Sequence, residues 1–115
     1  MASEFDFGQL DAITGGDTEF EVEVIQEYLA SAPKDVAKLR AAIEAGDVTA
    51  AGATAHALKG ASATLGAKGF AATALVIEQA GKKSEIEIAR KTIDQLEAEF
   101  VEVAEVLRQR LAKAA

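Results

Sequence analysis

The chain has 115 residues, of which half are hydrophobic and only 5% are aromatic, and this length is sufficient for one domain with a single core. A formal net charge of -7 argues against nucleic acid as the main ligand, because phosphate backbones are bound by clustered Lys and Arg. The absence of cysteine excludes disulfides, thiolate nucleophiles and the usual zinc frameworks, and a single histidine argues against a transition-metal site.

The sequence has no sign of a membrane segment or an export signal. No apolar run approaches the ~20 residues that a membrane span needs, and the N-terminus lacks a cationic region followed by an apolar stretch. We therefore expect a soluble, cytoplasmic protein that forms one domain over residues 1–115.

Capping residues divide the N-terminal part of the chain into two helices. Asp6 predicts the start of a short helix over about residues 7–13, which Gly15-Gly16 ends. Asp17 predicts the start of a longer helix that continues to about residue 45, with a kink or a brief break at Pro33. Its apolar residues recur at steps of three and four, and we expect them to face the core: Phe20, Val24, Tyr28, Ala32, Val36, Leu39 and Ile43.

Three more helices are expected after this one. The first two cover residues 48–65 and 67–80 and are separated at Gly66. Residues 81–83 are predicted to form a hinge, and residues 84–87 have the form of a capping box that begins the last helix. That helix continues toward Leu111, and its buried stripe is predicted to contain Ile86, Ile93, Leu96, Phe100, Val103 and Leu107.

Short connections favour antiparallel neighbours in a helical domain. The expected fold is therefore all-α, an antiparallel up-down four-helix bundle over residues 17–113. A short additional helix is expected in the N-terminal segment 1–16.

His56, the only histidine of the chain, lies in the predicted helix over residues 48–65. On a wheel of about 100° per residue, it lies roughly 140° from the centre of the apolar seam. The seam gathers Val48, Ala51, Ala55, Leu58, Ser62 and Leu65, whereas Thr49, Gly52, Lys59, Gly60 and Ala63 lie within about 60° of His56. The pattern predicts an outward imidazole among mostly small neighbours, although a surface histidine without a role is an open alternative.

Gly52 and Gly60 lie one turn on either side of His56. A glycine inside a helix costs about 1 kcal/mol relative to alanine, and this chain uses alanine freely. The pair indicates a surface kept bare so that another protein can approach the imidazole, with Lys59 placed to bring an ammonium group to a phosphoryl group. The alternative for Gly60 is that it permits close packing between helices.

An enzyme with its own substrate pocket is a poorer explanation of His56. A hydrolase needs a nucleophile and an orienting acid beside the histidine, but Ser62 lies on the core side of the same helix and there is no cysteine. A small bundle with few aromatic residues also offers little for a substrate pocket.

The segment from His56 to Ser62, followed by Leu65-Gly66-Ala67, resembles the histidine phosphotransfer (HPt) domain. The preceding run over residues 23–47, with its Ala45-Gly46-Asp47 turn, is similar to the helix and turn that precede the histidine in that family. The resemblance implies a four-helix bundle that relays phosphoryl groups between receiver-domain aspartates in a two-component phosphorelay.

The resemblance also implies roles for individual residues. His56 would accept the phosphoryl group on its outward ring nitrogen, Lys59 would offset its charge, and Gly60 would admit the partner. The family often carries a glutamine one helix later that holds the other ring nitrogen. Glu78 stands at the matching position, with Gln79 beside it, and a carboxylate there would accept a hydrogen bond from the ring.

The implied partners are response-regulator receiver domains and a hybrid sensor histidine kinase. Mg²⁺ would come from the receiver, so this chain would need no cofactor and would not bind ATP. We expect Gly52, Ala63, Lys82 and Ile13 at the partner surface, although the short first helix that carries Ile13 would alternatively serve as a lid over the bundle. We expect a monomer, and the alternative function is a non-catalytic helical module that binds a receiver without accepting phosphate.

Overall fold

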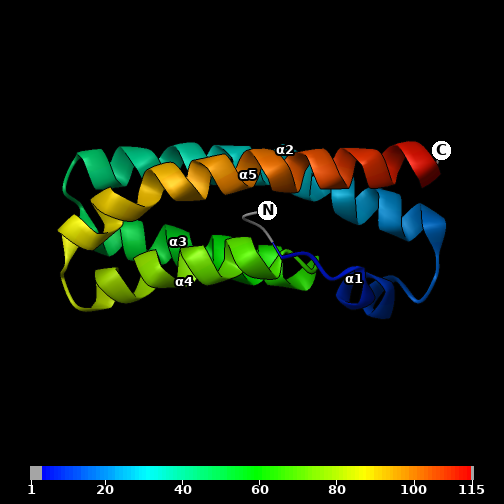
Figure 1. The fold of residues 1–115 in the computed structure, drawn as a ribbon, viewed down its shortest axis with the longest axis horizontal. Coiled ribbons are helices and arrows are strands. Elements are labelled where there is room, and N and C mark those ends of the chain that lie inside the picture. The colour runs from blue at the N-terminus through cyan, green and yellow to red at the C-terminus, as the bar shows by residue number, and fades with distance from the viewer. Residues whose placement is uncertain (1–3, 115) are drawn as a thin grey trace.

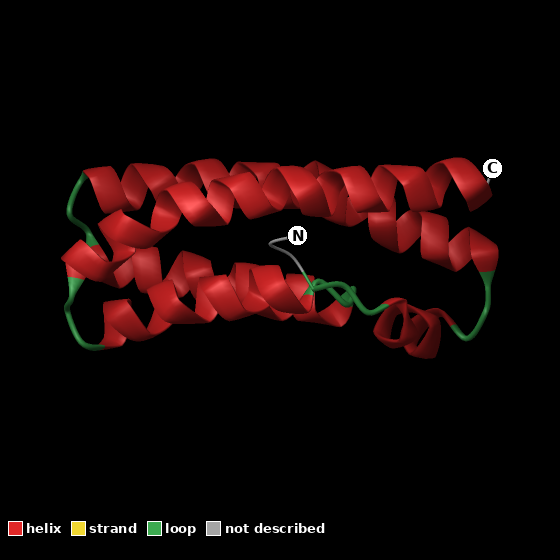
Figure 2. Ribbon diagram, viewed as in Figure 1, coloured by secondary structure: helices red, strands yellow, loops and turns green. Residues whose placement is uncertain are grey.

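The computed structural model describes residues 4–114, and within that range it contains helices and no strand. The five helices are α1 (Phe7–Thr14), α2 (Thr18–Glu44), α3 (Val48–Thr64), α4 (Lys68–Lys82) and α5 (Ile86–Ala114). The long helices α2 and α5 lie together along one side, α3 and α4 lie along the other, and α1 follows the end of that second pair (Figures 1 and 2). The predicted all-α bundle with an additional N-terminal helix is confirmed.

Aspartates begin the first three helices as the sequence predicts. The side chain of Asp17 accepts a hydrogen bond from the amide of Phe20 at 3.2 Å, and that of Asp47 accepts one from the amide of Ala50 at 3.0 Å. Each satisfies an amide that has no partner within its own helix. α2 continues through Pro33, so the chain has no break at this proline.

The predicted hinge and capping box after α4 are wrong. α4 continues through Gly81 and Lys82, and α5 begins only at Ile86. Ser84 has a positive φ of 57° and its amide donates to the carbonyl of Gly81 at 3.3 Å, while the next amide donates to the carbonyl of Ala80 at 2.8 Å. These bonds end a helix, so Ser84 closes α4 and the extra turn places residues 81 and 82 on the same helix as Glu78.

The core follows most of the predicted stripes. In α3 the seam from Ala51 to Leu65 is buried, and only Val48 at its start is half-buried. In α2 the prediction fails at the N-terminal end, because Phe20 is 42% exposed and Val24 is half-buried, while Ile25 is fully buried. α1 packs against α2, and the spacing of residues along α2 alone did not reveal this neighbour.

α1 is held against the end of the α3–α4 pair. Its Leu10 is fully buried, the amide of Asp6 donates to the carbonyl of Gly66 at 2.7 Å, and the amide of Gly69 donates to the carbonyl of Glu4 at 3.0 Å. These contacts favour the lid role for α1. The first three residues of the predicted segment 1–16 lie outside the described residues.

Over residues 4–114, none of the helices combines the length and the apolar character that a bilayer crossing requires.

Candidate functional site

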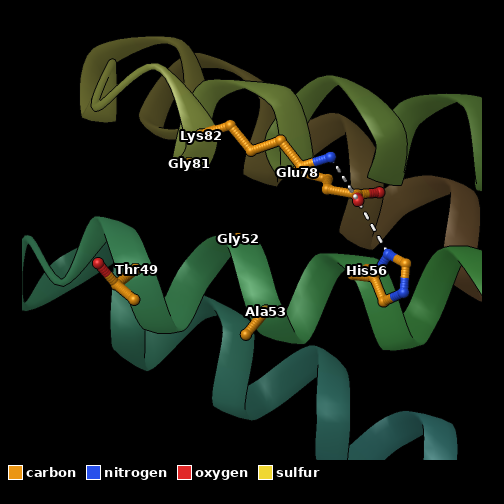
Figure 3. A pocket seen from close by; sticks show the side chains of 7 residues that line it. All are labelled: Thr49, Gly52, Ala53, His56, Glu78, Gly81 and Lys82. Carbon is orange, nitrogen blue, oxygen red and sulfur yellow. Dashed lines mark hydrogen bonds and ion pairs between the residues drawn. The ribbon is translucent and has the colours of Figure 1, made fainter.

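His56 extends from the middle of α3 into solvent. Its side chain is 68% exposed, whereas the preceding residue, Ala55, is fully buried in the core. The Nδ1 atom of the ring faces the carboxylate of Glu78 on α4 at 2.8 Å, and the other ring nitrogen points away from it (Figure 3). The predicted outward orientation of the imidazole is therefore the observed one.

Glu78 is the centre of an ion cluster that joins α3 to α4. Its side chain is only 6% exposed, and its Oε1 atom lies 2.7 Å from the Nζ atom of Lys59. The Nζ atom of Lys82 lies 3.5 Å from Oε2, the oxygen that contacts His56. The Lys59 ammonium is the main cause that lowers the pKa of Glu78 to about 2; burial opposes it, and the hydrogen bond with His56 lowers the pKa further.

The ionised carboxylate decides which ring nitrogen of His56 carries the proton. An ionised carboxylate only accepts hydrogen bonds, so Nδ1–H donates to Glu78 Oε2. In the neutral ring the lone pair then lies on Nε2, the exposed nitrogen. This arrangement presents a nucleophilic nitrogen to solvent and keeps the other one engaged.

Two glycines bring α3 and α4 together beside this cluster. A Cβ atom built on Gly52 would lie 3.2 Å from the Cα of Gly81, and one built on Gly81 would lie 2.7 Å from the Cα of Gly52. The helices thus meet backbone to backbone, which accounts for the glycine at position 52. Around Gly60, apart from its own helical turn, none of the described atoms lies within 4 Å of such a Cβ. Close packing between the helices therefore explains the glycine at position 52. Of the two glycines, only Gly60 still indicates a surface kept bare for a partner.

A hollow of about 480 Å³ opens beside the imidazole. It is lined by Thr49, Gly52, Ala53, His56, Glu78, Gly81 and Lys82 (Figure 3). Three of the described groups on its rim are ionisable, and the rest of the lining is small. Among residues 4–114 no group of three or more His, Cys, Asp and Glu side chains has a geometry that could hold a metal ion.

The model of the Hpt domain matches residues 23–111 of the chain. The chain belongs to the Hpt family. Its fold is also similar to the crystal structure of histidine-containing phosphotransfer protein B (HptB) from Pseudomonas aeruginosa PAO1, with a TM-score of 0.90, 26% sequence identity and coverage of 98% of each chain. A comparison with curated proteins finds no match.

The family confirms the function that the resemblance implied. Histidine phosphotransfer in a phosphorelay is the activity of this Hpt domain, and receiver domains and kinases are its classes of partner. The activity needs a histidine that a partner can reach, and the chain contains one histidine.

The structure gathers some of the residues that the sequence singled out and separates others. His56, Lys59, Glu78 and Lys82 form one cluster. Two more residues, Ala63 and Ile13, are both exposed but do not line the hollow beside His56; Ile13 is 38% exposed on α1.

Sequence reasoning missed Gly81 as a residue that lines the hollow beside His56. It was assigned to a hinge, although it follows Glu78 by three residues, which is one helical turn. A glycine one turn from the residue that matches the imidazole-holding position was the available signal. The assignment of the helix end hid it.

Proposed function

We propose that His56 is the phosphoryl acceptor of this Hpt domain and that it reacts through Nε2. The observation that carries the proposal is the pairing of a 68% exposed imidazole with a buried, ionised carboxylate at its Nδ1 atom. In the proposed reaction the Nε2 lone pair attacks the phosphorus of a receiver's aspartyl phosphate. The bond from phosphorus to the aspartyl oxygen breaks, and its electron pair stays on the receiver's carboxylate.

Glu78 stabilises the product of this step in the same proposal. After the attack both ring nitrogens are substituted, one by the proton on Nδ1 and one by the phosphoryl group, so the ring carries a positive charge. The ionised Glu78 oxygen 2.8 Å from Nδ1 offsets that charge without any proton leaving the ring. The same charge makes the imidazole a good leaving group when phosphate passes to the next receiver.

We propose that Lys59 and Lys82 offset the charge of the phosphoryl oxygens. Both ammonium groups already lie against Glu78, at 2.7 and 3.5 Å, one on each side of the carboxylate that holds the ring. The receiver supplies Mg²⁺ and the acidic pocket for in-line transfer in this proposal, so the Hpt domain itself contributes the nucleophile and the cations.

The proposed function also supports a cytoplasmic location, because the phosphoryl groups originate from ATP in a kinase.

The receiver is proposed to dock across α3 and onto α2. On the Gly60 side of His56, a groove between the two helices is lined by Val24, Glu27, Tyr28, Ser31, Gly60, Ala61, Thr64 and Leu65. It continues into a second hollow that includes Phe20, which is 42% exposed. Exposed apolar area of this kind is typical of protein interfaces. On the other side of His56, the hollow at Gly52 and Lys82 belongs to the same proposed contact, and Ala63 and Ile13 remain candidates for its edge.

Phosphorylation by a receiver tests the proposal directly. The protein is incubated with a receiver carrying radioactive phosphate, and label that is acid-labile and alkali-stable is expected on the wild type and absent from His56→Gln. Binding of the unphosphorylated receiver to both proteins, measured by calorimetry, verifies that the variant still docks. Label on His56→Gln would overturn the assignment, and docking by a wild type that never takes label would favour the non-catalytic module.

A further inference from the structure

The crossing of α3 and α4 at Gly52 and Gly81 is the tightest glycine contact between helices beside the site. A Cβ atom on Gly81 would have as its nearest neighbours the Cα of Gly52 at 2.7 Å, the nitrogen of Gly52 at 3.1 Å and the carbonyl oxygen of Val48 at 3.1 Å. All three are backbone atoms, so no side-chain rotation can make room. Any side chain at position 81 therefore pushes one helix away from the other.

This crossing lies one turn from the hydrogen bond between His56 and Glu78. Along α3, Gly52 precedes His56 by four residues, and along α4, Gly81 follows Glu78 by three. The glycine contact and the hydrogen bond consequently occupy adjacent turns of the same pair of helices, as Figure 3 shows. A displacement of α4 at Gly81 is carried to Glu78, because a helical turn is rigid on this scale.

We propose that Gly81 is a positioning residue for phosphoryl transfer, because its bare Cα sets the separation of α3 and α4 at which Glu78 reaches His56 Nδ1. The proposal rests on His56 being the phosphoryl acceptor. Relief of the contact at 2.7 Å to the 3.4 Å of ordinary packing requires a movement of about 0.7 Å. Added to the present 2.8 Å between Nδ1 and Oε2, the same movement brings that distance to the limit of a hydrogen bond.

Loss of that hydrogen bond changes the chemistry of the exposed nitrogen. With Glu78 in place, the proton of the neutral ring stays on Nδ1 and Nε2 is free to attack. Without it, the proton is free to occupy Nε2, which removes the lone pair from the nitrogen that faces the receiver. Gly81 therefore acts on the reaction through Glu78 and the ring tautomer, and it need not touch the phosphoryl group.

The competing explanation is that Gly81 serves only to pack the bundle. It predicts that a larger residue lowers stability without changing the state of the His56 ring. The two explanations are separated by a measurement on the ring itself, because a loss of stability alone does not move a proton from one nitrogen to the other.

The experiment compares Gly81→Ala with the wild type and with Leu107→Ala. Leu107 is fully buried on α5, a helix that does not form the crossing of Gly52 with Gly81, so its truncation lowers stability without touching the crossing. The ¹⁵N chemical shifts of the His56 ring are recorded in the neutral form, and the transfer rate is measured with a phosphorylated receiver. For Gly81→Ala we expect a shift of the proton from Nδ1 toward Nε2 and a transfer rate lower by about tenfold, measured at a receiver concentration that saturates both proteins. Leu107→Ala is expected to keep the wild-type tautomer and rate.

A retained Nδ1 proton and an unchanged rate in Gly81→Ala would overturn the inference. If Gly81→Ala does not fold, Gly52→Ala replaces it. A Cβ atom at position 52 would lie 3.2 Å from the Cα of Gly81, which is a less severe contact. We therefore expect the same changes in tautomer and rate, but smaller ones. Failure of the proposed acceptor has a different outcome, namely a wild type that takes no label. If the wild type is labelled on His56 and Gly81→Ala keeps the wild-type tautomer and transfer rate, only the role of Gly81 is rejected.

Discussion

Two kinds of ion cluster join the helices of this Hpt domain, and they differ in the sign of the charge at their centre. Around Glu78 one buried carboxylate is contacted by the two ammonium groups of Lys59 and Lys82, so the cluster carries +1 while the His56 ring is neutral. Around Arg40 one guanidinium is contacted by the three carboxylates of Glu44, Asp94 and Glu97, which leaves -2.

A third cluster repeats the second arrangement at the α1 end of the bundle. Arg110 pairs with Asp11 and Glu21, each at 2.8 Å, and its guanidinium lies 4.4 Å from the centre of the Phe7 ring. Carboxylates outnumber the cation there too. The comparison teaches that similar ion pairs serve different ends: a net positive cluster with outer cations attracts an anionic phosphoryl group, whereas a cluster whose carboxylates outnumber its cation repels it.

Removal of the anionic centre is expected to have the largest effect. Glu78→Ala leaves the His56 ring without an acceptor at Nδ1, and the transfer rate should fall by about ten- to a hundredfold. Glu78→Gln keeps an acceptor oxygen for the Nδ1 proton but removes the charge that offsets the phosphorylated ring, so its rate should lie between those of Glu78→Ala and the wild type. Rates are measured from the loss of label from a phosphorylated receiver in rapid-quench experiments. Equal rates for Glu78→Ala and the wild type would show that the carboxylate does not orient the ring.

Removal of the outer cations should have a smaller, graded effect. Lys59→Met removes the closest ammonium partner of Glu78 and should lower the transfer rate by about tenfold. Lys82 is 72% exposed, so Lys82→Met should cost less than about 1 kcal/mol, or about fivefold in rate. Lys83→Met is the matched control, since Lys83 is exposed just after α4 and should have the wild-type rate. The same loss in all three variants would mean that only the overall charge matters.

The low pKa of Glu78 also predicts a dependence of stability on pH. Its value of about 2 in the folded protein lies below the ordinary 4.5, chiefly because of the Lys59 ammonium. The ionised carboxylate therefore stabilises the fold above about pH 4.5, and this contribution is lost as the pH falls toward about 2. Between about pH 6 and about pH 2 the wild type should lose more free energy of unfolding than Glu78→Gln in urea titrations. If the free energy of unfolding falls equally with pH in the two proteins, the lowered pKa of Glu78 is contradicted.

A cluster with a cation at its centre should contribute to stability and leave transfer untouched. Arg110→Ala removes two ion pairs and the contact with Phe7, and it should lower the free energy of unfolding by about 1–2 kcal/mol. The transfer rate well below the unfolding temperature should not change. Arg108→Ala, at an exposed position of the same helix, is the control for loss of a surface charge. A slower transfer in Arg110→Ala at full folding would mean that the α1 end of the bundle takes part in the reaction.

Much of the fold was predictable because helix ends and helix faces are local properties. Asp17 and Asp47 cap their helices as the sequence predicts, since a short acidic side chain satisfies the nearest free amides wherever it occurs. The face of α3 that carries His56 was predictable for a similar reason, because the helical repeat alone separates it from the buried seam. Ser84 escaped prediction because its sequence fits a capping box, whereas the chain uses it in the left-handed conformation to end α4.

The sequence by itself therefore determined the helices, the outward direction of the only histidine, and the family to which the chain belongs. The tertiary structure alone decided how closely the neighbours of that histidine approach it. The crossing of Gly52 with Gly81, the reach of Glu78 to Nδ1 and the exposure of Phe20 all depend on how two helices sit against each other. Contacts between helices depend on ridges, grooves and the sizes of distant residues, and a repeat read along one helix contains no information about its neighbour.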